Sequence, residues 1–107
     1  IKEQIMEYKL RYLPIAKQDL ADAISFIYYT YQNPVAAENT LNKIEKAIMD
    51  RLEDGPESFA IWPSNKERDF PYRRINVGNY TVWYVVIDKV MEVRRIQPSR
   101  RNEENFL

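Results

Sequence analysis

The chain opens with an alternation of apolar and polar positions. In residues 8–13 tyrosine and leucine alternate with lysine and arginine, and Pro14 follows directly. A two-residue period is typical of a half-buried strand, and proline cannot continue the ladder of hydrogen bonds. The pattern predicts a strand over residues 8–13. The first five residues fit no element, and we expect them to lie upstream of the domain.

Two longer segments carry apolar residues at three- and four-residue steps, the period of an amphipathic helix. The first covers residues 15–31. The second begins at Asn33-Pro34, an N-cap followed by proline at the first helical position, and ends at Gly55-Pro56. The apolar positions are Ala16, Leu20, Ala23, Ile24, Ile27, Tyr28 and Tyr31 in the first segment and Ala37, Leu41, Ile44, Ile48 and Leu52 in the second. We predict a helical hairpin, with Tyr28, Tyr29 and Tyr31 in its core and rim.

The last third of the chain has the pattern of an antiparallel meander. Strands are predicted near 72–77, 80–87 and 90–97, joined by the two-residue turns Gly78-Asn79 and Asp88-Lys89. Residues 57–71 form an irregular connection before them. The predicted fold class is α+β: an N-terminal strand and a two-helix hairpin packed on an antiparallel sheet with a three-stranded C-terminal meander.

The meander is expected to have two faces of different chemistry. If Val77 pairs with Tyr80 and Ile87 pairs with Val90, strand alternation assigns each side chain to a face. The face toward the helices carries Ile75, Val77, Tyr80, Val82, Tyr84, Val86, Met91 and Val93. The other carries Tyr72, Arg74, Asn76, Thr81, Trp83, Glu92, Arg94 and Ile96. Such a mixture of arginine and aromatic groups is unlike a plain solvent face, so we expect function there.

Composition narrows the chemistry. At 107 residues the chain is expected to form a single domain over 1–107. It contains neither cysteine nor histidine, which excludes disulfides, thiolate nucleophiles, thiolate zinc sites and histidine acid–base catalysis. We expect no metal and no cofactor. No apolar stretch is long enough to cross a bilayer, so a cytoplasmic location and no membrane partner are expected.

The charges are polarised along the chain although the net charge is zero. Residues 1–67 hold eight Lys and Arg against eleven Asp and Glu, whereas residues 68–101 hold eight against three. Local fields rather than net charge steer encounters with charged partners. The basic C-terminal third therefore suits phosphate backbones or an acidic partner, and an ordinary solvated rim is the alternative.

The order strand, two helices, three strands and a basic end resembles the RelE/ParE superfamily of toxins from type II toxin–antitoxin systems, over roughly residues 8–107. The residues that carry the resemblance are Asp19-Leu20, Ile24, Ile27-Tyr28, Asn33-Pro34, Ala36-Ala37, Leu41 and Ala47-Ile48 in the hairpin, and Tyr72-Arg73-Arg74, Val77-Gly78-Asn79-Tyr80, Trp83-Tyr84, Arg95-Ile96 and Arg100-Arg101 in the last third. The long hairpin linked by asparagine and proline is closer to the ParE branch, whose members poison DNA gyrase. RelE members cut messenger RNA on the ribosome.

The resemblance also implies site residues. For a RelE-type nuclease the candidate catalytic residues are Arg74, Arg94 and Arg101, because arginine neutralises the phosphate of the transition state. Candidate target-binding residues are Tyr72, Thr81, Trp83 and Arg100. Trp83 could stack on a base, and the alternative, which is more frequent for a strand tryptophan, is that it only covers apolar area. Thr81 stands where RelE-type nucleases have an arginine, and Tyr72 replaces another basic residue. The late tyrosine of such nucleases falls at about Leu107.

The two remaining arginines of the strands are expected elsewhere. Neighbouring strand residues point to opposite faces, which places Arg73 and Arg95 on the helix side. There we expect Arg95 to pair with a helix carboxylate.

Three hypotheses follow for the function. The first is a growth-arresting toxin that inhibits DNA gyrase without being an enzyme. The second is a metal-independent endonuclease that cuts mRNA on the ribosome, and the third is a degenerate toxin that only binds its antitoxin. In each case the expected partner is a cognate antitoxin protein.

Overall fold

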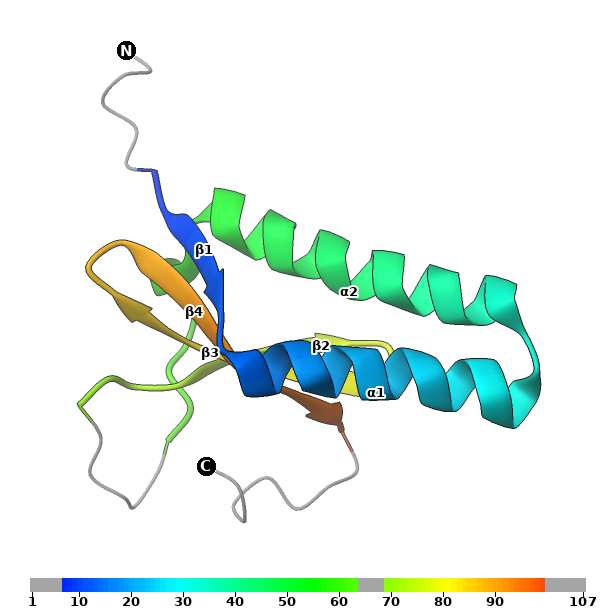
Figure 1. Cartoon of the computed structure of the whole chain (residues 1–107). Coiled ribbons are helices and arrows are strands. Elements are labelled where there is room, and N and C mark those ends of the chain that lie inside the picture. The colour runs from blue at the N-terminus through cyan, green and yellow to red at the C-terminus, as the bar shows by residue number, and fades with distance from the viewer. Residues whose placement is uncertain (1–6, 64–68, 100–107) are drawn as a thin grey trace.

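The computed structural model describes residues 7–63 and 69–99, and the structural statements below concern these residues (Figure 1). The elements in chain order are β1 (Lys9–Tyr12), α1 (Pro14–Tyr31), α2 (Pro34–Asp54), the 3-10 turn η2 (Pro56–Ser58), β2 (Arg73–Val77), β3 (Tyr80–Ile87) and β4 (Val90–Pro98). This order confirms the predicted α+β fold of one strand, a helical hairpin and a three-stranded meander.

The four strands form one sheet in the order β1-β4-β3-β2. The meander β2-β3-β4 is antiparallel, as predicted, but β1 lies parallel to β4 with Lys9 opposite Val90. The sheet is therefore mixed rather than antiparallel throughout. Nothing in the local pattern of residues 8–13 specifies a partner strand about eighty residues away.

The helices begin and end where the local chemistry predicts. At the start of α2, Asn33 Oδ1 accepts a hydrogen bond from the backbone nitrogen of Ala36 at 3.0 Å, and Pro34 occupies the first helical position. Gln32 links the helices in the left-handed conformation, with φ of 49°. These features produce the tight turn between α1 and α2.

The core lies between the hairpin and one face of the sheet. Its buried members are Ala16, Ile44, Ile48, Ile75, Val82, Tyr84, Met91, Val93 and Ile96. Arg51 of α2 donates to the hydroxyl of Tyr84 at 2.8 Å, and that hydroxyl donates to the carbonyl of Pro56 at 2.8 Å. This chain of hydrogen bonds ties the end of α2 and η2 to β3.

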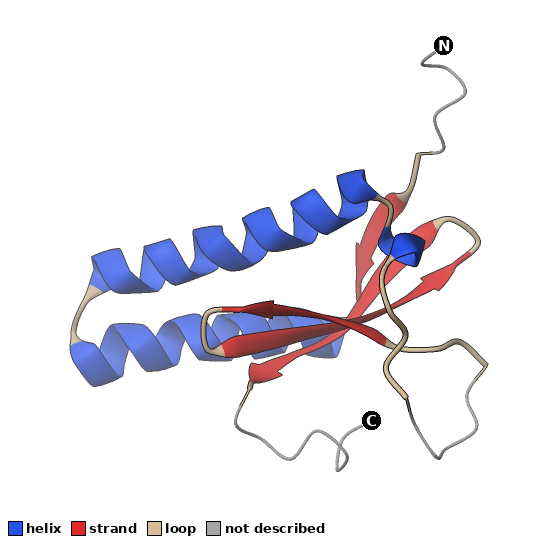
Figure 2. Cartoon of the chain, turned by 180° about the vertical axis from the view of Figure 1, so that it is seen from behind, coloured by secondary structure: helices blue, strands red, loops and turns tan. Residues whose placement is uncertain are grey.

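The tyrosines at the end of α1 lie outside this core. Tyr28, Tyr29 and Tyr31 are all exposed, so the prediction that this cluster contributes to the core of the hairpin is wrong. Both views show that the connected ends of α1 and α2 extend past the end of the sheet (Figures 1 and 2). The helical pattern of apolar residues in α1 therefore continues past the end of the sheet, where no strand covers it.

No helix in the described part of the chain is long and apolar enough to span a membrane.

Candidate functional site

The position of the arginines on the sheet is set by a β-bulge. In the pairing of β3 with β4, Trp83 lies opposite Arg95 and Tyr84 lies opposite Val93, so Arg94 is an extra residue without a partner in the ladder. An extra residue shifts the alternation by one, so each side chain beyond the bulge points to the opposite face from the one that simple alternation gives. Simple alternation over residues 90–97 therefore gives the wrong faces beyond Arg94.

Two predicted placements are corrected by this phase change. Arg95 comes onto the face that carries Trp83 rather than the helix face, since residues opposite each other in a ladder share a face. Ile96 pairs with Val82 and belongs to the core rather than to the arginine-bearing face. Both arginines of the pair are thus on the side of the sheet away from the core. We refer to this side as the arginine face, comprising Arg11, Tyr72, Arg74, Trp83, Glu92, Arg94 and Arg95.

The predicted ion pair between Arg95 and a helix carboxylate is confirmed. Arg95 Nε and Nη2 donate to the two carboxylate oxygens of Asp19 in α1, at 2.8 and 3.0 Å. Asp19 Oδ2 also accepts the backbone N–H of Ile96 at 3.0 Å. β1 pairs with β4 only as far as Val93. Beyond Val93, the Asp19 carboxylate therefore accepts the backbone N–H of Ile96 at an edge of β4 that β1 does not cover. The hydrogen bond from Arg95 to Asp19 also raises the pKa of Arg95.

A second carboxylate lies at the centre of the arginine face. Glu92 Oε1 accepts from Arg11 Nη2 at 2.7 Å and from its Nε at 2.9 Å, while Glu92 Oε2 accepts from Arg94 Nε at 2.7 Å. The Glu92 side chain is only 7% exposed. Burial alone would raise the pKa of Glu92, but hydrogen bonds and charges from Arg94 and Arg11 outweigh it, and the pKa lies below its ordinary value. Glu92 is thus an anion held between two cations.

Aromatic rings form the other half of the arginine face. The rings of Trp62 and Trp83 lie 5.4 Å apart edge to face, and Tyr72 lies 6.4 Å from Trp83. The guanidinium of Arg74 is 4.2 Å from the centre of the Trp62 ring, a cation–π distance. Arg94 Nη1 donates to the hydroxyl of Tyr72 at 3.4 Å. Arg74, Arg94 and Tyr72, which the sequence places together, therefore do share one surface.

Two of the predicted target-binding residues are buried. Trp83 is 0% exposed, packed beside the ring of Trp62, and Thr81 is 1% exposed. The Thr81 hydroxyl donates to Asn76 Oδ1 at 3.1 Å and lies 2.9 Å from that of Ser99. Burial favours the alternative in which Trp83 covers apolar area, and both side chains support the surface from beneath rather than meeting a target directly. Trp83 cannot stack on a base while Trp62 covers it.

The remaining predicted residues, Arg100 and Arg101, lie outside the described residues. Sequence reasoning missed Arg11, Trp62 and Asp19 as members or neighbours of this surface. Arg11 had a weak signal, because it alternates with the apolar residues of the first strand, but its contact with Glu92 depends on the parallel pairing of β1. Within the described ranges no group of three Asp or Glu side chains is placed to hold a metal ion.

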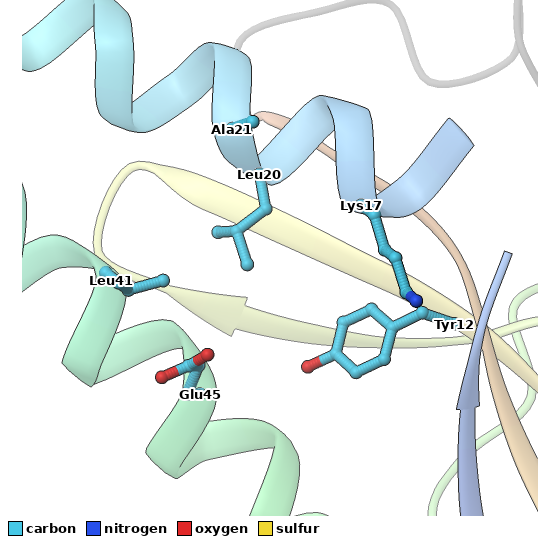
Figure 3. Close-up of a pocket in the computed structure, with 6 residues that line it drawn as sticks. All are labelled: Tyr12, Lys17, Leu20, Ala21, Leu41 and Glu45. Atoms are coloured by element: carbon cyan, nitrogen blue, oxygen red, sulfur yellow. The ribbon is translucent and has the colours of Figure 1, made fainter. Parts of the chain in front are cut away.

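A separate concave site lies between the two helices (Figure 3). It has a volume of about 340 Å³ and is lined by Tyr12, Lys17, Leu20, Ala21, Leu41 and Glu45. The close-up shows Leu20 and Leu41 on facing helices, and beside them the Tyr12 ring from β1, whose hydroxyl is directed toward the side of Glu45. Burial, with the charge of Glu45, raises the pKa of the Tyr12 hydroxyl. An apolar side chain with a polar edge would suit this pocket.

Comparison with known proteins finds a matching family model and solved structures with a similar fold. A family model described as the ParE toxin of a type II toxin–antitoxin system, parDE, matches residues 10–103. The chain is similar in structure to the chromosomal ParDE system of P. aeruginosa, with a TM-score of 0.70, 18% identity, and coverage of 88% of this chain and 98% of that one. It is also similar to the archaeal RelE–RelB complex of Pyrococcus horikoshii OT3, with a TM-score of 0.57, 23% identity, and coverage of 90% and 99%. At these identities the structural likeness shows the fold. No curated protein matches the sequence.

Proposed function

The chain belongs to the ParE toxin family of type II toxin–antitoxin systems, and from this premise we propose that it arrests growth by binding and inhibiting DNA gyrase, without being an enzyme. The observation that carries the proposal is the internal pairing of the arginine face. Arg11 and Arg94 share the carboxylate of Glu92, and Arg95 is paired with Asp19. A face of this kind can dock a protein more readily than it can neutralise a transition-state phosphate.

The chemistry of RNA cleavage explains why the pairing matters. Attack by a 2′-hydroxyl requires that hydroxyl to lose a proton and the leaving oxygen to gain one, with cations on the phosphate between them. Arginine supplies cations but is a poor proton carrier, because its pKa exceeds about 12. Glu92 is held as an anion by two arginines, which keeps it from acting as an acid. The chemistry therefore supports a binding role over a catalytic one.

A ribosome-dependent mRNA endonuclease is the second candidate. One observation favours it: Arg74, Arg94 and Tyr72 do gather on one surface, where an RNA could pass. In this reading Arg94 would have to exchange Glu92 for a phosphate oxygen.

We also propose a cognate antitoxin as the partner that holds the toxin inactive. The pocket between α1 and α2, lined mainly by apolar groups such as Leu20 and Leu41, would receive an apolar side chain from a helix or extended segment of that partner. Disordered segments of this kind can wrap a large surface when they fold on binding.

Two assays on the same preparation test the proposal. Purified full-length chain is added to a gyrase supercoiling and cleavage assay and to an in vitro translation reaction in which message ends are mapped. We expect inhibited supercoiling and intact message. Cleaved message that becomes intact in Arg74→Ala and Arg94→Ala, but not in the helix variant Lys46→Ala, would establish the nuclease instead. If neither assay responds and expression leaves growth unchanged, the chain is a toxin that only binds its antitoxin.

A further inference from the structure

Two arginines of the arginine face keep hydrogen-bond donors that the fold does not use. Arg11 donates to Glu92 through Nε and Nη2, and Arg94 donates to Glu92 through Nε and to the Tyr72 hydroxyl through Nη1. A guanidinium carries five N–H donors, so each group retains several. In the described part of the chain, neither Arg11 Nη1 nor Arg94 Nη2 meets an acceptor. The two side chains are 51 and 29% exposed, so a partner can reach these edges.

The charge around these two arginines is not balanced. Lys9 lies two residues before Arg11 on β1, about 7 Å along the strand, and on the same face of the sheet. Both point away from the core, against which the alternate residues of β1 pack. Lys9 is exposed, and its side chain forms no ion pair with a carboxylate of the described residues. Three cations, Lys9, Arg11 and Arg94, therefore lie beside the single carboxylate of Glu92, and the surplus charge is positive.

Glu92 fixes the positions of the two guanidiniums. Its nearly buried carboxylate contacts Arg11 and Arg94 at 2.7 Å each, so the guanidiniums are held against one group. Side chains that are already held lose less conformational entropy when they bind a ligand than free arginines do. The paired N–H groups of a guanidinium match the two oxygens of a carboxylate or a phosphate. The site is therefore preorganised for one more anionic group of this shape.

The rings of the arginine face favour a protein carboxylate over a phosphate of nucleic acid. Proteins that bind single-stranded nucleic acid combine cations with rings on which the bases stack. Here Trp83 is fully buried beside Trp62, and Trp62 in turn lies against the guanidinium of Arg74 at 4.2 Å. The Tyr72 ring lies against Trp83 and the guanidinium of Arg94. A positive site whose rings are engaged in this way suits an acidic side chain of a protein.

From these observations we propose that Lys9, Arg11 and Arg94 form a binding site for an acidic segment of the target protein. One carboxylate of the segment accepts from the outer N–H groups of the two guanidiniums, while Glu92 stays in place between them. A second acidic side chain of the segment meets Lys9. This inference rests on the proposed function, because it names the surface by which the toxin would hold gyrase. Charged contacts of this kind steer association and weaken as salt is added.

Inhibition of gyrase supercoiling by the full-length chain tests the site. We compare the wild type with Arg11→Gln, Arg94→Gln and Lys9→Gln, and with the matched control Lys43→Gln, which removes the same charge from an exposed position of α2. Half-inhibition should require about tenfold or more protein in either arginine variant, the scale of a charged hydrogen bond. Lys9→Gln should require about two- to fivefold more, the scale of an exposed ion pair. Lys43→Gln should match the wild type.

Stability is separated from binding by the choice of variants. Removing either arginine leaves Glu92 with one partner fewer, so circular dichroism and urea midpoints are measured beside inhibition. Lys9→Gln breaks no side-chain contact of the described residues, and its stability should equal that of the wild type. A loss of inhibition in Lys9→Gln therefore reports binding even if an arginine variant folds poorly.

Two labelled probes identify the kind of partner without gyrase. Fluorescence anisotropy follows a peptide of glutamates and a uridylate RNA of equal charge, at low and at high salt. We expect the peptide to bind at low salt and to be lost in the arginine variants, but not in Lys43→Gln. RNA that binds more tightly than the peptide, with the same loss in the arginine variants, would make the site one for nucleic acid and overturn the proposal.

The failure of the site and the failure of the proposed function give different results. Equal inhibition of gyrase by all variants overturns the site and leaves gyrase as the target. A wild type that does not inhibit gyrase removes the proposed function. In that case the site stands if the arginine variants lose the glutamate peptide, and it is overturned if they bind the peptide as the wild type does.

Discussion

The arginine face and the connected end of the hairpin differ in how far their side chains are engaged within the fold. We call the end of α1 that carries Tyr28, Tyr29 and Tyr31 the hairpin tip. On the arginine face, Glu92 and Asp19 neutralise three arginines, and Trp62 covers Trp83. At the tip, rings such as Tyr29 remain largely in solvent. The residue types that suggest binding to nucleic acid are thus largely engaged within the fold, while the residue types that suggest a core are available to a partner. Availability, rather than residue type, separates a binding surface from a supporting one.

The largest expected difference between the two regions appears when one aromatic ring is removed from each. Trp83→Ala should lower the free energy of unfolding by about 3 to 5 kcal/mol, because a fully buried large side chain leaves a cavity. Tyr29→Ala should change it by no more than about 0.5 kcal/mol, as expected for an exposed site. Urea unfolding followed by fluorescence and circular dichroism measures both. Equal losses would mean that the two regions are packed alike.

The sequence predicts the helices, strands and turns of both regions better than it predicts which of their side chains are exposed. The period of residues 15–31, the Asn33-Pro34 start and the two tight turns are local signals, and each is confirmed. Exposure of Tyr28 and Tyr31 could not be predicted in this way, because the helical period does not reveal where the sheet ends. A pattern shows which side of a helix is apolar, not whether anything lies against it.

On the arginine face, too, the pattern of one strand does not determine where every side chain lies. Arg74 is on the predicted face because β2 is regular, and Tyr72, just before β2, contacts Arg94 there. One extra residue at Arg94, however, reassigned Arg95 and Ile96. A bulge depends on the fit between two strands, and the alternation of one strand carries no sign of it. The Glu92 cluster likewise required the parallel partner that brings in Arg11.

The second test removes the charge of Glu92 and keeps its shape. Glu92→Gln should destabilise the protein at pH 7 by about 1 to 2 kcal/mol, because Arg11 and Arg94 lose a charged acceptor but can partly return to water. The matched control is Asp50→Asn, which breaks the exposed Lys46–Asp50 pair and should cost at most about 0.5 kcal/mol. Urea midpoints of the two variants give the difference. Comparable losses would show that Glu92 is no more than a surface partner.

Acid titration sharpens the same test. The pKa of folded Glu92 lies below its ordinary value of 4.5, so the unfolded chain takes up this proton at a higher pH than the folded one. The stability that Glu92 contributes is therefore fully present above pH 4.5 and is lost as the pH falls through the folded pKa. Urea unfolding of wild type and Glu92→Gln from pH 7 downward should show two curves that converge below pH 4.5. A constant separation would contradict the ion-pair account.

The smallest expected effect comes from the N-cap of α2, where Asn33 accepts a hydrogen bond from Ala36. Asn33→Ala removes the oxygen that accepts the N–H of Ala36 and should cost about 1 kcal/mol of stability, the usual value for an N-cap. Asn33→Asp keeps that oxygen and adds a negative charge at a helix N-terminus, so its stability should equal or exceed that of the wild type. Thermal and urea unfolding of both variants measure the cap. An Asn33→Ala variant as stable as the wild type would show that the hydrogen bond from Ala36 contributes nothing to the start of α2.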